Sequence, residues 1–182
     1  MSQPCSTQKK DDAFAATVLV VHGDVRNPSR LDQVMLGQQA VIDVVGGTKP
    51  YLETDLESGA AKVVIDVMKR NDVKRLIVVS AMGVADSKEH AGFFYEHLLM
   101  PLFLGGIMRD KARMETEVEH SGLDFVIVRP PLLKDSDETG HVHIVTGHDQ
   151  AHTITRGDLA RFLVDQLASN QYVGQEVTIA NK

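Results

Sequence analysis

Three things are scarce in this sequence of 182 residues: cysteine, tryptophan and long hydrophobic runs. The single cysteine, Cys5, excludes an internal disulfide. No stretch reaches the ~20 consecutive apolar residues that a membrane-spanning helix requires. Residues 1–12 are polar and lack the apolar centre of a secretory signal peptide. We therefore expect a cytoplasmic protein.

Positive charge is also in deficit, because 19 lysines and arginines face 25 acidic residues for a net charge of -6. Nonspecific nucleic-acid binding needs a basic surface that meets the phosphates. An anionic membrane surface would repel the same excess of acidic residues. The charge balance therefore predicts neither nucleic acid nor membrane as a partner.

What the sequence does contain is typical of one soluble domain, with 43% apolar and 24% charged residues. The polar residues 1–12 predict a disordered leader. Residues 13–182 then form a single domain, since no linker, repeat or low-complexity tract interrupts them.

Apolar, β-branched runs alternate with amphipathic segments along this domain. The runs predict strands at 16–22, 40–45, 76–79, 124–129 and 175–180, with a short strand near 141–145. The segments between them predict helices at 28–36, 54–71 and 107–120, and a further helix from 155 whose buried face is Leu159, Phe162, Leu163 and Leu167. This alternation predicts an α/β fold, a parallel sheet with helices on both faces.

Three helix starts carry capping signals. Asn27 followed by Pro28 is a cap with proline in the first turn. Thr54 with Glu57, and Thr155 with Asp158, have the spacing of a capping box.

The run Leu76–Val79 is continuous, as in a strand buried on both faces, and it ends at Ser80. Parallel sheets place their ligand sites outside the carboxyl ends of the strands. Ser80 is the first polar side chain at that end, so we interpret it as a candidate active-site residue. The alternative is a serine that only begins a turn before Gly83.

Histidines offer a weaker hint of a metal site. His141 and His143 share one face of a predicted strand, with His148 and His152 nearby. No cysteine or paired carboxylate completes a ligand set at the usual spacing. The sequence therefore predicts no metal.

Several sequence motifs, in this order, resemble the atypical short-chain dehydrogenase/reductase family, nearest to its NmrA-like and biliverdin/flavin reductase-like branches. The matching segments are 23–25, 40–47, 76–80, 109–115, 121–124, 127–131 and 154–160. The resemblance implies a Rossmann-like fold, an NAD(P) cofactor and a small planar or carbonyl acceptor.

The resemblance also implies roles for individual residues. Ser80 matches the active-site serine or threonine, and Lys111 matches the lysine that holds the nicotinamide ribose. The other implied cofactor-binding positions are Asp24 and Val25 at the adenine edge, Gly46, Gly47 and Thr48 in a loop passing close to the dinucleotide, and Pro130, Pro131 and Leu132 beside the nicotinamide. For Asp24 the alternative is a residue that only forms the turn after the strand. For Lys111 the alternative is a solvated lysine on the polar face of its helix.

Two departures from the family pattern affect function. The family tyrosine expected one helical turn before Lys111 is Ile107, which cannot donate a proton. No Gly-x-x-Gly-x-x-Gly turn, which receives the pyrophosphate, occurs anywhere. The resemblance therefore implies a Rossmann-like sheet truncated at its N-terminal side, without the first strand, the glycine turn, the helix and the second strand.

Three functions follow: an NAD(P)H-dependent reductase, a non-catalytic NmrA-like sensor, or a remnant that has lost the cofactor and acts through association. A truncated sheet exposes an edge beside residues 40–45. We expect residues 17–22 to pair with that edge, and the part of the face left uncovered to form a homodimer.

Overall fold

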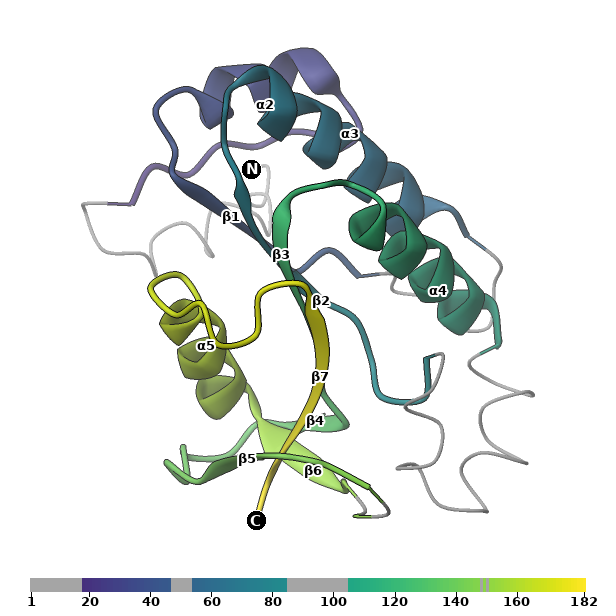
Figure 1. Ribbon diagram of the computed structural model, residues 1–182, viewed down its shortest axis with the longest axis vertical. Coiled ribbons are helices and arrows are strands. Elements are labelled where there is room, and N and C mark those ends of the chain that lie inside the picture. Colours follow the sequence, from purple (N-terminus) through teal and green to yellow (C-terminus); the bar gives the residue numbers. More distant parts are fainter. Residues whose placement is uncertain (1–17, 47–53, 85–104, 148, 150) are drawn as a thin grey trace, which may run out of the picture.

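A five-stranded sheet with helices on both faces forms the centre of the computed structural model (Figure 1), which describes residues 18–46, 54–84, 105–147, 149 and 151–182. Its strands are β1 (Ala40–Asp43), β2 (Arg75–Val79), β3 (Asp124–Arg129), β5 (Val142–Ile144) and β7 (Gln175–Asn181). They lie in the order β1-β2-β3-β7-β5. All neighbours are parallel except β5 and β7. The predicted parallel α/β sheet is confirmed.

Four described helices cover the sheet: α2 (Pro28–Met35), α3 (Leu56–Arg70), α4 (Gly105–Glu119) and α5 (Arg156–Asp165). Figure 1 shows α2, α3 and α4 on one side and α5 on the other. A second, two-stranded parallel sheet joins β4 (Leu132–Lys134) to β6 (Thr153–Thr155). Neither of these short strands was predicted, because each has only three residues and lies in a polar stretch.

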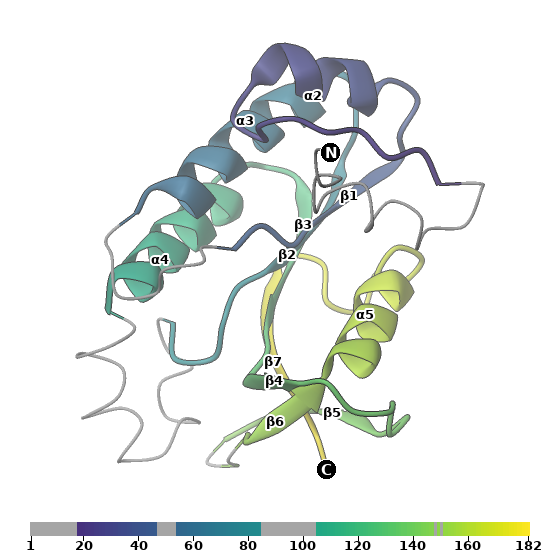
Figure 2. The ribbon, with the colours of Figure 1, turned by 180° about the vertical axis from the view of Figure 1, so that it is seen from behind.

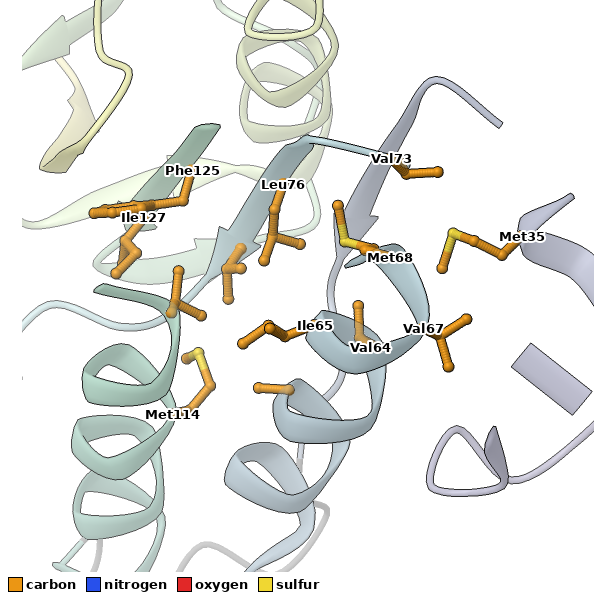
Figure 3. Close-up of a cluster of buried hydrophobic side chains, with 13 residues drawn as sticks. Met35, Val64, Ile65, Val67, Met68, Val73, Leu76, Met114, Phe125 and Ile127 are labelled. Atoms are coloured by element: carbon orange, nitrogen blue, oxygen red, sulfur yellow. The ribbon is translucent and has the colours of Figure 1, made fainter. Parts of the chain in front are cut away.

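The alternation of side chains along the strands divides the core into two clusters. Leu76 and Val78 of β2 face α3 and α4, whereas Ile77 belongs to the cluster under α5. Figure 3 shows Ile65 and Met114 reaching the first cluster from two different helices. Burial on both faces explains why these strands are uninterrupted apolar runs.

A buried ion pair ties α4 to the middle strand. The guanidinium of Arg129 donates through Nε and Nη2 to the two carboxylate oxygens of Glu115, at 3.0 and 2.8 Å. Both side chains are almost completely buried. This bidentate geometry fixes the rotation of α4 relative to β3.

A second buried carboxylate, Asp158, joins the start of α5 to the neighbouring loop and to β7. It accepts hydrogen bonds from both Thr139 donors, the Gly140 amide, the Thr155 hydroxyl and the Asn181 amide group. Burial alone would raise the pKa of Asp158, but these hydrogen bonds hold it far below its usual value. Thr155 caps the helix as predicted, since its hydroxyl accepts from the Asp158 amide.

The predicted strand at 16–22 is wrong for its described part. Residues 18–22 are neither helix nor strand, and most are exposed (Figure 2). They do not pair with β1, which has β2 as its one strand partner among the described residues. Leu167 is also wrong as a buried residue, because it lies beyond the end of α5 and is 40% exposed.

The Arg129–Glu115 pair gives a stability prediction. Arg129→Met leaves a buried carboxylate without its cation, so we expect the free energy of unfolding to fall by ~3–5 kcal/mol. The double variant Arg129→Met with Glu115→Leu removes both charges and recovers most of that loss. Urea denaturation measures both; equal losses in the two variants would contradict the argument.

Candidate functional site

Ser80 lies at the carboxyl end of β2, as predicted. Its amide donates to the Val128 carbonyl at 2.8 Å, and two residues later the Met82 amide donates to the Pro130 carbonyl at 2.9 Å. Ser80 is 3% exposed, and its hydroxyl has no hydrogen-bond partner in the described part of the chain. A buried hydroxyl without a partner is costly, and it is available to a ligand.

Pro130, Pro131 and Leu132 follow β3 and lie beside this end of β2, because the Met82–Pro130 hydrogen bond continues the ladder past the strands. Both prolines are buried. Leu132 is 69% exposed, so an apolar side chain faces solvent where β3 ends. The structure therefore places Pro130 beside the Ser80 end of β2, and Pro131 and Leu132 follow it along the chain.

Lys111 is not a solvated surface lysine. Its ammonium lies 2.8 Å from Oε2 of Glu57 in the first turn of α3, and both side chains are buried. Gly46, at the end of the β1 segment, passes the same carboxylate, since a Cβ there would lie 3.9 Å from Oε1 of Glu57. The strand register pairs Asp43 with Val78, so this group lies next to the Ser80 end of β2.

Asp43 is a second carboxylate in this group, and the sequence analysis did not identify it. It is 8% exposed, and its Oδ1 accepts from the Val45 amide at 2.9 Å. Burial raises the pKa of Asp43, and the nearby Glu57 carboxylate raises it further, while the Val45 hydrogen bond and Lys111 oppose the shift. A charged residue inside the apolar run 40–45 was the available signal, because such a residue needs a partner.

Asp110, next to Lys111 on α4, caps the start of α3. Its carboxylate accepts from the amides of Glu57 and Ser58 at 2.9 and 3.2 Å, and from the Ser58 hydroxyl at 2.6 Å. The capping box predicted at Thr54 is wrong, because the N-cap residue is Asp55 and its side chain makes no cap hydrogen bond. The Thr54 hydroxyl accepts from the Leu56 amide at 2.9 Å, whereas the Glu57 amide, which the box would have used, donates to Asp110 of another helix. Sequence spacing does not reveal such a partner.

Asp24 has the geometry of a turn former. Its Oδ1 accepts from the Arg26 amide at 2.9 Å, and its carboxylate pairs with the Arg26 guanidinium at 3.2 Å. Hydrogen bonds from the side chain and the amide of Arg26 lower the pKa of Asp24. Val25 packs against the cluster under α3. Their adenine-edge roles stay predictions, and Gly47 and Thr48 lie outside the described residues.

Among the described residues, no three histidine, cysteine or acidic side chains are placed to hold a metal ion. In that same part of the chain, no helix is both long and apolar enough to cross a membrane.

Comparison with known proteins decides the family. Residues 6–170 match the model of a family described as NAD(P)H-binding. The chain belongs to this NAD(P)H-binding family. A curated relative, an uncharacterized chloroplastic protein of Arabidopsis thaliana (At2g34460), is 23% identical over an alignment of 179 residues, and the match covers 96% of this chain. The chain spans 61% of the length of that relative.

Several solved structures share the fold of this chain. The oxidoreductase ylbE from Lactococcus lactis is 23% identical with a TM-score of 0.74, and the match covers 93% of this chain and 74% of that one. The anaerobilin reductase ChuY from Escherichia coli O157:H7 is 23% identical with a TM-score of 0.69, over 87% and 73% of the chains. A short-chain dehydrogenase/reductase from Veillonella parvula, solved with NADP, is 16% identical with a TM-score of 0.75, and the match covers 92% of this chain and 74% of that one.

The cytoplasmic location stays a prediction.

The unpaired hydroxyl of Ser80 gives a matched pair of predictions. Ser80→Ala removes a buried group that has no partner, so we expect the free energy of unfolding to stay the same or to rise by up to ~1 kcal/mol. Ser121→Ala is the control, because that buried hydroxyl accepts from the Leu123 amide and its loss costs ~1 kcal/mol. A larger loss for Ser80→Ala than for Ser121→Ala, measured by urea denaturation, would show that Ser80 has a structural partner.

The cap formed by Asp110 predicts a dependence of stability on pH. Burial would raise the pKa of Asp110, but the Ser58 and Glu57 hydrogen bonds lower it. The carboxylate therefore stabilises the fold above its unfolded pKa of about 3.9, and this contribution disappears as the pH falls through the lower folded value.

We expect Asp110→Ala to lose ~1–3 kcal/mol near neutral pH, and to lose less on further acidification than the unchanged chain. Asp110→Asn keeps acceptor capacity and is the matched control. Identical acid sensitivity in all three proteins, measured by urea denaturation, would contradict the role of this carboxylate.

Proposed function

We propose that this chain is an NAD(P)H-dependent reductase-like protein that recognises chiefly the nicotinamide end of its cofactor and acts on a small planar or carbonyl acceptor. The observation that carries this proposal is the buried hydroxyl of Ser80. It has no partner among the described residues, and it lies at the end of β2 beside Pro130. Ligands of open parallel sheets bind at this edge.

Lys111 suits a ribose ligand, although it is already paired. An ammonium group has three N–H donors, and among the described residues Lys111 has one ion pair, with Glu57. The remaining donors are available to the hydroxyls of a ribose. Glu57 acts as a positioning residue, because it fixes where the ammonium of a flexible four-carbon side chain lies.

The phosphate end of the cofactor fits less well. No glycine-rich phosphate turn occurs in the sequence, and Asp110 already occupies two amides at the start of α3. A pyrophosphate that loses two or three charge-assisted hydrogen bonds, each ~1.5–3 kcal/mol, binds with millimolar rather than micromolar affinity. Weak binding of the dinucleotide is therefore part of the proposal.

The acceptor side of the site has an apolar surface among the described residues. Leu132, exposed at the start of β4, provides a contact for a flat, apolar acceptor. NAD(P)H supplies a hydride when bound. Ile107, one turn before Lys111, supplies no proton, so the acceptor takes its proton from water. A substrate that accepts a hydride without a strong acid suits such a site.

The alternative is a non-catalytic sensor of the NmrA-like kind. The sensor is favoured by the start of α3, whose amides are already bound by the Asp110 carboxylate. This negative charge lies where a helix N-terminus would otherwise attract an anion such as the cofactor phosphate. Turnover separates the two functions: oxidation of NADPH in the presence of a flavin or a biliverdin supports the reductase, and binding without turnover supports the sensor.

Calorimetry with NADPH, NADH and reduced nicotinamide mononucleotide tests which end of the cofactor is recognised. Because the adenylate half adds few contacts, we expect the mononucleotide to bind within about tenfold of NADPH, that is, within ~1.4 kcal/mol. The double variant Lys111→Met with Glu57→Met removes both buried charges and abolishes binding of all three. Lys69→Met, an exposed lysine at the far end of α3, is the control.

A micromolar dissociation constant for NADPH with a much weaker mononucleotide would show that the phosphates are held by other residues. No binding of any of the three, with a folded protein, would overturn the proposal.

A further inference from the structure

The edge of β1 has the properties of a strand that lacks a neighbour. Among the described residues it pairs on one side alone, with β2. Its sequence and the next two residues, 40–45, contain one charged side chain, Asp43, and no lysine or proline. Val44 is 65% exposed. Natural edge strands usually carry charge, proline or a bulge that blocks further pairing, and here the one such feature is Asp43, whose side chain is buried.

An apolar groove of about 390 Å³ runs beside this edge. It is lined by Leu31, Val34 and Met35 of α2 and by the residues of β1, with Val25 and Val64 completing the wall. The lining is almost entirely aliphatic, which suits an apolar strand better than a polar ligand.

The same chain contains a segment with the composition of a strand that pairs with none of the described strands. Val18-Leu19-Val20-Val21 is a continuous aliphatic run of the kind that forms buried strands, yet it is a coil (Figure 2). Leu19 is 86% exposed. Among the described residues, the chain therefore exposes the unpaired edge of β1 and a strand-like segment, Val18–Val21, that pairs with no sheet.

Contacts within the chain place the end of this segment against α2. Arg30 Nη2 donates to the His22 carbonyl at 3.2 Å, and a Cβ on Gly23 would lie 3.8 Å from Cβ of Arg30. Leu19 and Val21 line a second cavity, of about 910 Å³, against α2, and it shares Val25, Leu31 and Val34 with the groove. The groove beside β1 is not lined by Leu19 or Val21.

We propose that Val18–Val21 of one copy docks as an added strand on the β1 edge of a second copy, and that the exchange is reciprocal. Each copy offers one segment and one edge, so a two-fold arrangement uses all four elements and closes at two chains. Backbone hydrogen bonds along β1 supply affinity, and the aliphatic side chains fill the groove. This inference is independent of the proposed cofactor function.

Cysteine cross-linking tests the exchange directly, because Cys5 is the single native cysteine and Cys5→Ser gives a cysteine-free background. Val20→Cys and Ile42→Cys are made as separate proteins, mixed and treated with a short bismaleimide. We expect a covalent dimer from the mixture and little from either protein alone. Val164→Cys replaces Val20→Cys in the control mixture, since Val164 is exposed on α5.

Three other outcomes of the cross-linking experiment would each overturn the proposal. A dimer from Ile42→Cys alone would show that two β1 edges pair with each other. A cross-linked monomer from the protein carrying both cysteines would show that the segment folds back onto its own edge. No cross-link above that of the Val164 control would show that the edge and the segment do not meet.

Light scattering provides a second measurement. We expect a mass of twice the 20.0 kDa of one chain. Leu19→Asp, at an exposed position that should tolerate the change, weakens the dimer by at least about tenfold, because a carboxylate cannot enter an aliphatic groove without a partner. Val164→Asp leaves the mass unchanged. A monomeric parent protein would overturn the proposal.

Discussion

The carboxylate of Asp110 is the interaction on which the candidate site depends. By accepting two amides at the start of α3, it fixes the end of one helix against the middle of another. The adjacent Lys111 then reaches Glu57, and Glu115 on the same helix reaches Arg129 of β3. Three buried charged residues of α4, Asp110, Lys111 and Glu115, thus hold α3 and the central strand β3 in position. A shift of α4 would move all three contacts together.

The same interaction also limits what the site can bind. A helix N-terminus attracts anions when its amides are free, but here an internal anion already occupies them. In the proposed function, recognition comes from other groups at this edge: the Ser80 hydroxyl, the remaining donors of Lys111 and the apolar surface at Leu132. These groups suit a ribose and a flat ring better than a phosphate.

Sequence reasoning succeeded where local pattern and burial agree. The run at 76–79 had to be a buried strand, and Ser80 therefore had to lie at its end. It failed at residues 18–22, where an equally apolar run has no neighbouring strand in the structure, because a strand needs a partner as well as a composition. It also failed at Thr54, since Asp110, more than 50 residues away in the chain, supplies the cap. The ion pair of Lys111 with Glu57 depends on how α3 and α4 pack, which no spacing encodes.

The position of β7 has a consequence for how the protein is made. This strand comes after all the others along the chain, yet it lies inside the sheet, between β3 and β5. On the ribosome, β3 and α5 emerge first, with the apolar face of α5 and one edge of β3 still uncovered. The second core cluster cannot close until residues 175–181 have left the exit tunnel. Folding of this half therefore waits for residues 175–181, and until they emerge the nascent chain exposes an apolar surface that chaperones can bind.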